Sequence, residues 1–98
     1  MITGKQRSFL KKMAHNLDPI VHVGKNGATD SVIKQIDDIL ETRELVKVKL
    51  LESSDLDSRE TGNDIAGRLA AEFIQSIGGI FVIYRESIDN KQIQLPKK

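Results

Sequence analysis

The 98-residue chain contains no cysteine and no tryptophan, two prolines, and only three phenylalanines and one tyrosine. The absence of cysteine excludes disulfide scaffolds, cysteine-ligated zinc or iron–sulfur sites and thiol chemistry, and it fits a reducing compartment. No stretch approaches the roughly 20 consecutive apolar residues that cross a bilayer, and the first residues lack the apolar core of a signal peptide. We therefore expect a cytoplasmic protein with no membrane partner, whose fold depends on apolar packing.

Charge is nearly balanced in total but segregated along the chain. Fifteen Lys and Arg residues oppose 14 Asp and Glu residues, which gives a net charge of +1. Residues 1–27 carry five cations and one carboxylate, whereas residues 28–44 sum to −3 and residues 52–77 to −4. This alternation predicts one basic and one acidic side, with scattered solvated charges as the alternative.

The length predicts one domain, residues 1–98, because a chain this short forms a single modest core and leaves no room for a large enzyme fold. Hydrophobic periodicity and capping signals predict its elements. Thr3 followed by Gln6 is a capping-box pattern, and Asp57 or Thr61 begins the third helix. The predicted order is α-β-α-β-α-β-β, with helices at about 4–15, 29–42 and from 57 or 61 to 77, and strands at 20–23, 45–51, 80–84 and 93–95.

These elements predict an α/β fold, in which a mixed four-stranded sheet packs with three helices. Strands joined by a helix are expected to run parallel, and 80–84 and 93–95 to pair antiparallel. The 80–84 segment is apolar on both faces, as in a central strand. Gly62 and Gly67 each weaken the third helix by about 1 kcal/mol relative to alanine, so packing must compensate, with close backbone approach expected at Gly67.

A glycine-rich loop, Gly24-Lys25-Asn26-Gly27, separates the first strand from the second helix. Ligands of open α/β sheets bind beyond the carboxyl ends of strands, where a helix N-terminus presents free amides. Glycine has no Cβ to keep a ligand away, Lys25 adds a positive charge and Asn26 an amide, so the loop could hold phosphates as the GxxG loop of KH domains does. The alternative is a plain strand-to-helix turn that uses the positive-φ tolerance of Asn26-Gly27.

Other basic residues could form a track that leads to this loop. They lie on the polar face of the first helix and on the wetted face of the 45–51 strand, namely Lys5, Lys11, Lys12, Lys47 and Lys49. Aromatic stacking platforms are scarce, because the three phenylalanines fit core stripes. Contact with the nucleic-acid backbone is therefore favoured over base reading.

Three motifs in the chain together resemble the bacterial YhbY-type CRM domain. The resemblance begins with residues 3–10 and extends over nearly the whole sequence. The motifs are LDPIVHVGKNG at 17–27, LVKVK at 45–49 and IFVIYR at 80–85. The resemblance implies a stand-alone RNA-binding domain associated with precursors of the large ribosomal subunit, with ribosomal RNA as partner. It also implies a fold like the C-terminal domain of a translation initiation factor.

In this family the GxxG loop and adjacent basic surface are the proposed RNA contacts, which implies a site at Gly24, Lys25, Asn26 and Gly27. The charge pattern extends the predicted site to Lys5, Lys11, Lys12, Lys47, Lys49 and Arg85. The acidic stretch 52–64 is expected to face away from RNA.

Two other classes of function compete with this interpretation. An enzyme or metal site would need more than His15 and His22, which lack metal-ligand spacing, or Asp55 and Asp57, which lack the rest of a calcium loop. We therefore predict no catalysis, cofactor, metal or small-molecule substrate. The remaining alternative is a protein-interaction module that docks a partner through the acidic third helix or an edge strand.

Overall fold

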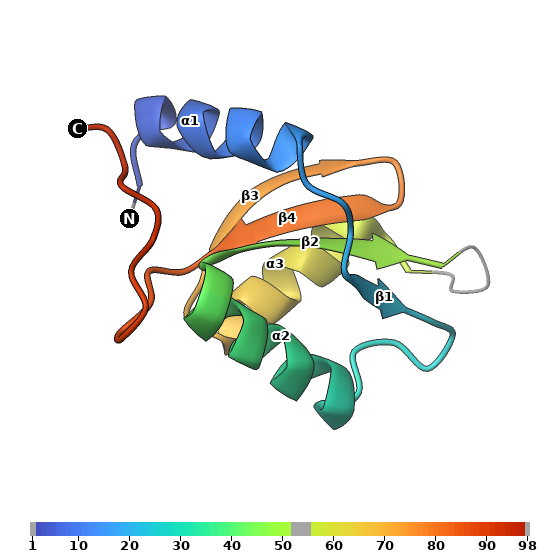
Figure 1. Cartoon of the computed structure of the whole chain (residues 1–98). Helices are drawn as coiled ribbons and strands as arrows, with labels where there is room; N and C mark the ends of the chain where they lie inside the picture. Colours follow the sequence, from blue (N-terminus) through green and yellow to red (C-terminus); the bar gives the residue numbers. More distant parts are fainter. Residues whose placement is uncertain (1, 52–55, 98) are drawn as a thin grey trace.

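The computed structural model describes residues 2–51 and 56–97, and their helices and strands follow the predicted order α-β-α-β-α-β-β (Figure 1). The helices are α1 (Gly4–His15), α2 (Asp30–Arg43) and α3 (Ser58–Arg68). The strands are β1 (Val21–Val23), β2 (Leu45–Leu50), β3 (Glu72–Ile77) and β4 (Ile80–Tyr84). No helix of the described residues is long and apolar enough to span a membrane.

Each helix begins at a side chain that satisfies free backbone donors of its first turn. At α1, the Thr3 hydroxyl accepts from the Gln6 N–H (3.2 Å) while the Gln6 amide oxygen accepts from the Thr3 N–H (3.0 Å). Thr29 caps α2. Asp57 caps α3, which settles the start of the third helix at the first of its two predicted positions.

The sheet has the strand order β1-β2-β4-β3. β1 runs parallel to β2, and β4 lies antiparallel between β2 and β3. β4 is therefore a central strand, as its apolar sequence predicted. α2 and α3 cover one face of the sheet and α1 covers part of the other, so each face has its own apolar cluster (Figure 1).

The prediction that the third helix runs to Ile77 is wrong, because α3 ends at Arg68 and residues 72–77 form β3. Ala70 takes a left-handed backbone (φ 54), and the Ala71 N–H closes the helix on the Ala66 carbonyl (2.8 Å). This type of helix end normally uses glycine, so the sequence gives no stop signal there. Gly78 and Gly79 form the turn of the β3–β4 hairpin instead of ending a helix.

Two further expectations about strands change as a result. The strands at 45–50 and 80–84 pair antiparallel instead of parallel, because β3 intervenes between helix α3 and β4. Residues 93–95 form no strand. The fourth strand of the mixed sheet is β3, which occupies the edge beside β4.

Two carboxylates near the end of α2, those of Glu41 and Glu44, accept hydrogen bonds from the C-terminal segment 87–93. Glu44 is fully buried and accepts hydrogen bonds from the N–H groups of Ser87 (2.8 Å), Gln92 and Ile93 (both 2.7 Å). Burial alone would raise the pKa of Glu44, but these backbone donors lower it below its usual value. This network keeps residues 87–93 irregular, since it uses the amides that a strand would need.

The close backbone approach in α3 occurs at Gly62 and not at Gly67. A Cβ at Gly62 would lie 2.7 Å from Cε1 of Phe73 and 2.9 Å from Cγ of Phe81. Gly67 is exposed and has nothing within 4 Å. Glycine at 62 therefore lets α3 lie directly on the aromatic side chains of β3 and β4.

Candidate nucleic-acid interface

The Gly24–Gly27 loop forms a tight turn between the end of β1 and the start of α2. The Gly27 N–H donates to the Gly24 carbonyl (3.0 Å), and Gly27 has a left-handed backbone (φ 70). Lys25 and Asn26 are exposed at the tip of the turn. The turn geometry explains Gly27, because a residue with a Cβ is strained at this φ.

Glycine at position 24 has no such structural explanation. Its φ lies outside the left-handed region, and a Cβ there would make an ordinary contact of 3.8 Å with Cδ1 of Leu51. The inner side of the loop also faces Leu56, which lies 3.7 Å from a Cβ built at Gly27. The loop therefore rests on two leucines and presents its tip to solvent, with a bare backbone at Gly24 that neither folding nor packing requires.

Next to this loop, the end of the sheet that α1 leaves uncovered carries cationic and apolar side chains. The register aligns His22 with Lys49, Lys49 with Ile80, and Ile80 with Ile77. Because paired residues share a face, these four form one row across the sheet. His22 and Lys49 are exposed, and Ile77 is 70% exposed.

Helix α1 continues this surface on its C-terminal half. Lys11, Lys12 and His15 line a hollow together with Gln75 and Ile77, so the helix meets the exposed row at β3. α1 contains no acidic residue. We call the surface formed by Lys11, Lys12, His15, His22 and Lys49 the basic face.

Lys5 and Lys47, two lysines of the predicted site, lie near the basic face, but only Lys47 donates hydrogen bonds to the backbone. Lys5 is exposed two helical turns before Lys12, which puts both on the same side of α1. The Lys47 ammonium donates to the carbonyls of Ala14 and Leu17 (both 3.1 Å). Lys47 therefore ties the end of α1 to β2, a role that the alternating sequence did not indicate.

The structure places Arg85 apart from the other predicted residues. Its guanidinium lies 2.7 Å from an Asp37 carboxylate oxygen and donates to the Leu69 carbonyl (3.0 Å). These partners belong to the α2 and α3 side of the sheet, at the end opposite the Gly24–Gly27 loop. Arg85 joins the two helices to β4 and is not brought to the basic face.

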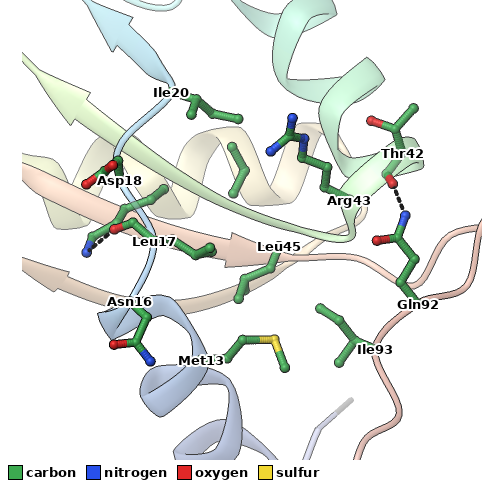
Figure 2. A pocket seen from close by; sticks show the side chains of 12 residues that line it. Met13, Asn16, Leu17, Asp18, Ile20, Thr42, Arg43, Leu45, Gln92 and Ile93 are labelled. Carbon is green, nitrogen blue, oxygen red and sulfur yellow. Dashed lines mark hydrogen bonds between the residues drawn. The ribbon is translucent and has the colours of Figure 1, made fainter.

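A hollow of about 770 Å³ opens beside Lys47, where α1 ends. Figure 2 shows Met13, Leu45 and Ile93 around it, with Arg43 reaching in from the end of α2. Lys47 forms part of its wall. A hollow lined by both apolar and polar side chains thus adjoins the cationic surface.

The acidic residues of the third helix region lie on the other face of the sheet. Asp57, Glu60 and Asp64 line a hollow with Arg68 and Leu56. In the described part of the chain, the basic face thus lies on the α1 side of the sheet and these carboxylates on the α3 side, as the charge pattern predicted. The Gly24–Gly27 loop lies between the two. Positions 52–55, which include Asp55 and the first part of the predicted acidic stretch, lie outside the described residues.

Sequence reasoning treated His15 and His22 as ordinary surface or core residues, and the structure exposes both on the basic face. The alternation of His22 with buried Val21 and Val23 was the available signal. In residues 2–51 and 56–97, no group of three or more His, Asp or Glu side chains is placed to hold a metal ion.

Comparison with known proteins identifies a family and its named relatives. The family model described as the CRS1 / YhbY (CRM) domain matches residues 2–85. The chain is 45% identical over 96 residues to the probable RNA-binding protein YqeI of Bacillus subtilis, covering 98% of this chain and 100% of that protein. It is 40% identical over 97 residues to a protein of Haemophilus influenzae named RNA-binding protein, covering 99% and 97% of the two chains.

A solved structure shares the fold. The solution structure of SAV1595 from Staphylococcus aureus superimposes with a TM-score of 0.82 at 48% identity, covering 98% of this chain and 100% of that one. The two proteins therefore share the mixed sheet with three helices.

Proposed function

Because the chain belongs to the CRS1/YhbY (CRM) domain family, we propose that it binds the phosphate backbone of RNA through the Gly24–Gly27 loop and the basic face. The observation that carries this proposal is the position of the loop. It follows β1 directly, next to His22, and Lys49 lies opposite His22 on β2. A bare backbone, two lysines (Lys25 and Lys49) and the His22 imidazole thus lie together at one exposed edge, which suits an extended polyanion.

Phosphate contact is favoured over base reading because of where the aromatic side chains lie. Phe81 and Tyr84 are buried, and Phe9 and Phe73 pack against the two apolar clusters. Proteins that contact the bases of single strands usually stack them on exposed aromatic side chains. Binding is therefore driven by charge. The logarithm of the binding constant should fall by about 0.7 per phosphate contact for each tenfold rise in salt concentration.

The RNA in this proposal is ribosomal, in precursors of the large subunit, and the protein acts in the cytoplasm during assembly. This part rests on the resemblance of residues 17–27, 45–49 and 80–85 to YhbY-type domains. In this proposal the protein binds RNA and catalyses no reaction, so it needs no cofactor or small-molecule substrate.

The competing interaction module has less support in the observed helix. α3 carries two arginines, Arg59 and Arg68, against Glu60 and Asp64, so the helix itself is neutral. In the described part of the α3 region, the negative charge that a basic partner would need is confined to the hollow of Asp57, Glu60 and Asp64, which Arg68 also lines.

The test is ultraviolet crosslinking in cells, followed by sequencing of the RNA attached to the protein. We expect fragments enriched in large-subunit ribosomal RNA, from particles that sediment as precursors, and fewer crosslinks for Lys25→Glu. Fragments in proportion to total transcript abundance would contradict the ribosomal role. Recovery of a stoichiometric protein partner without RNA would favour the interaction module.

A further inference from the structure

A groove of about 650 Å³ runs along β3, the edge strand of the sheet, between α1 and α3. α1 contributes Arg7 and Lys11, one helical turn apart, and α3 contributes Arg59 and Asn63, also one turn apart. Gln75 of β3 lies between the two helices. In Figure 1, β3 lies at the margin of the sheet beneath α1.

Every charged side chain that lines this groove is a cation, namely Arg7, Lys11 and Arg59. Within the described residues, Lys11 and Arg59 form no ion pair with a carboxylate. The other α3 arginine, Arg68, differs because it pairs with Asp64 at 3.3 Å. The groove therefore has uncompensated positive charge, which is complementary to a polyanion.

The two arginines are held in place by contacts with β3. The Arg59 guanidinium lies 5.8 Å from the ring centroid of Phe73, a cation–π distance. Arg7 donates through Nη1 to the carbonyls of Phe73 and Ile74 (3.0 Å to the latter). Their positions are thus set by the strand.

The same contacts make the strand edge a poor template for a peptide strand. The pairing of β3 with β4 shifts register between Phe73 and Gln75, which marks a bulge. Arg7 occupies the carbonyls of Phe73 and Ile74 that an added strand would use. Bulges and charged side chains block edge-to-edge pairing of strands. The groove therefore presents cationic side chains but not the free backbone groups that a peptide strand would pair with.

The groove is continuous with the basic face through Lys11. This side chain lines both the groove and the hollow that contains Lys12 and His15. We propose that the groove formed by Arg7, Lys11 and Arg59 binds further phosphate groups of the same RNA, beyond those held at the Gly24–Gly27 loop. This inference rests on the proposed function and adds α3, on the far side of the edge strand, to the binding surface.

The test measures binding of a labelled, mixed-sequence single-stranded RNA of about 20 nucleotides, a length above the site size of one small domain. Arg59→Gln is compared with Arg68→Gln, which removes the same charge from the same helix. We expect Arg59→Gln to weaken binding about threefold to fivefold and to reduce the salt slope by about 0.7, whereas Arg68→Gln stays within about twofold of wild type.

Two more variants separate charge from folding. Arg59→Lys keeps the cation and should bind within about twofold of wild type. Asn63→Asp removes the amide that donates to the Arg59 carbonyl (3.0 Å) and places a carboxylate one helical turn from Arg59, within reach of an ion pair. Because it neutralises positive charge in the groove, it should weaken binding as Arg59→Gln does. Thermal unfolding of each variant confirms the native fold.

The outcomes distinguish this inference from the proposed function. If Arg59→Gln and Asn63→Asp both bind like wild type while Lys25→Gln binds more weakly, the groove proposal is overturned and the loop proposal stands. If wild type does not bind this RNA at low salt, both are overturned. An equal loss for Arg59→Gln and Arg68→Gln also contradicts the groove, because it indicates only the effect of net charge.

Discussion

His22 of β1 and Lys49 of β2 lie directly opposite each other in the parallel strand pair, on the face of the sheet that α1 leaves open. The valines on either side of His22 point into the core on the opposite face. A histidine and a lysine are therefore fixed side by side by the backbone register, close to the Gly24–Gly27 loop. The strand part of the basic face therefore follows from β-strand alternation, whereas Lys11, Lys12 and His15 are brought to it by the position of α1 beside β3.

The first prediction concerns the lysines of α1. Replacement of Lys5, Lys11 and Lys12 by alanine should lower the affinity for unrelated RNA sequences by nearly equal factors, because phosphate contacts position RNA without reading its sequence. Fluorescence anisotropy with several oligonucleotides of equal length measures this. A strong change in sequence preference would contradict backbone contact. The three side chains are exposed, so the helix content should not change.

The two loop glycines should respond differently to alanine. Gly27→Ala should destabilise the protein by about 1–2 kcal/mol, because Gly27 has a positive φ of 70. Gly24→Ala should change the unfolding free energy by less than about 0.5 kcal/mol, since the new Cβ makes only an ordinary contact. Gly24→Ala should nevertheless weaken RNA binding. Urea titration and anisotropy on the same samples test both parts, and unaltered RNA affinity for Gly24→Ala would exclude close backbone approach at this position.

The glycines of α3 form a second matched pair. Gly62→Ala should destabilise the fold by about 1–3 kcal/mol, because the new Cβ overlaps the rings of Phe73 and Phe81. Gly67→Ala should stabilise it by up to about 1 kcal/mol, since alanine is the better helix former and the site is open. Denaturant unfolding of the two variants measures the difference, and similar effects of both would show that α3 does not approach the aromatic side chains so closely.

The third helix region shows what limited prediction from the sequence. Phe73, Ile74 and Ile77 have helical spacing, yet they belong to β3, where the bulge between Phe73 and Gln75 breaks the alternation of a strand. The end of α3 uses Ala70 in a conformation that usually signals glycine. Both features depend on tertiary packing, so local patterns could not separate one long helix from a helix followed by a strand.

The strand lysines and the loop of the candidate site could be predicted from the sequence, whereas the positions of its arginines could not. Strand alternation predicted that Lys47 and Lys49 share a face, and the glycine spacing predicted a loop between the first strand and the second helix. The groove that contains Arg7 and Arg59 could not be predicted. The two side chains come together only because α1 and α3 flank the edge strand β3, and the sequence predicted helix for the residues of that strand. The separation of Arg85 from the site likewise depends on its partner Asp37, 48 residues away.

The carboxylates that hold the C-terminal segment predict a dependence of stability on pH. Backbone donors at Ile88 and Asp89, together with the Ser87 hydroxyl, lower the pKa of Glu41 from 4.5 to about 2, and the pKa of Glu44 is also lowered. A carboxyl with a lower pKa in the folded state stabilises the fold above its unfolded pKa, near 4.5. This contribution is lost as pH falls toward the folded value.

Urea unfolding at pH 7 and pH 3 measures this effect. Glu44→Gln should lower the midpoint at pH 7, because an amide oxygen cannot accept all three N–H donors that Glu44 binds. The difference from wild type should shrink at pH 3. A constant difference at both pH values would mean that the charge of Glu44 does not hold the segment.

The most direct test of the account compares two double variants that each remove two positive charges. Lys25→Gln with Lys49→Gln changes the loop and the basic face, whereas Lys34→Gln with Arg68→Gln changes cations that pair with Asp38 and Asp64 on the α2 and α3 side. Dissociation constants are measured for one RNA at one salt concentration. We predict a loss of about tenfold or more for the first variant and less than about twofold for the second; equal losses would contradict RNA binding at the Gly24–Gly27 loop and the basic face.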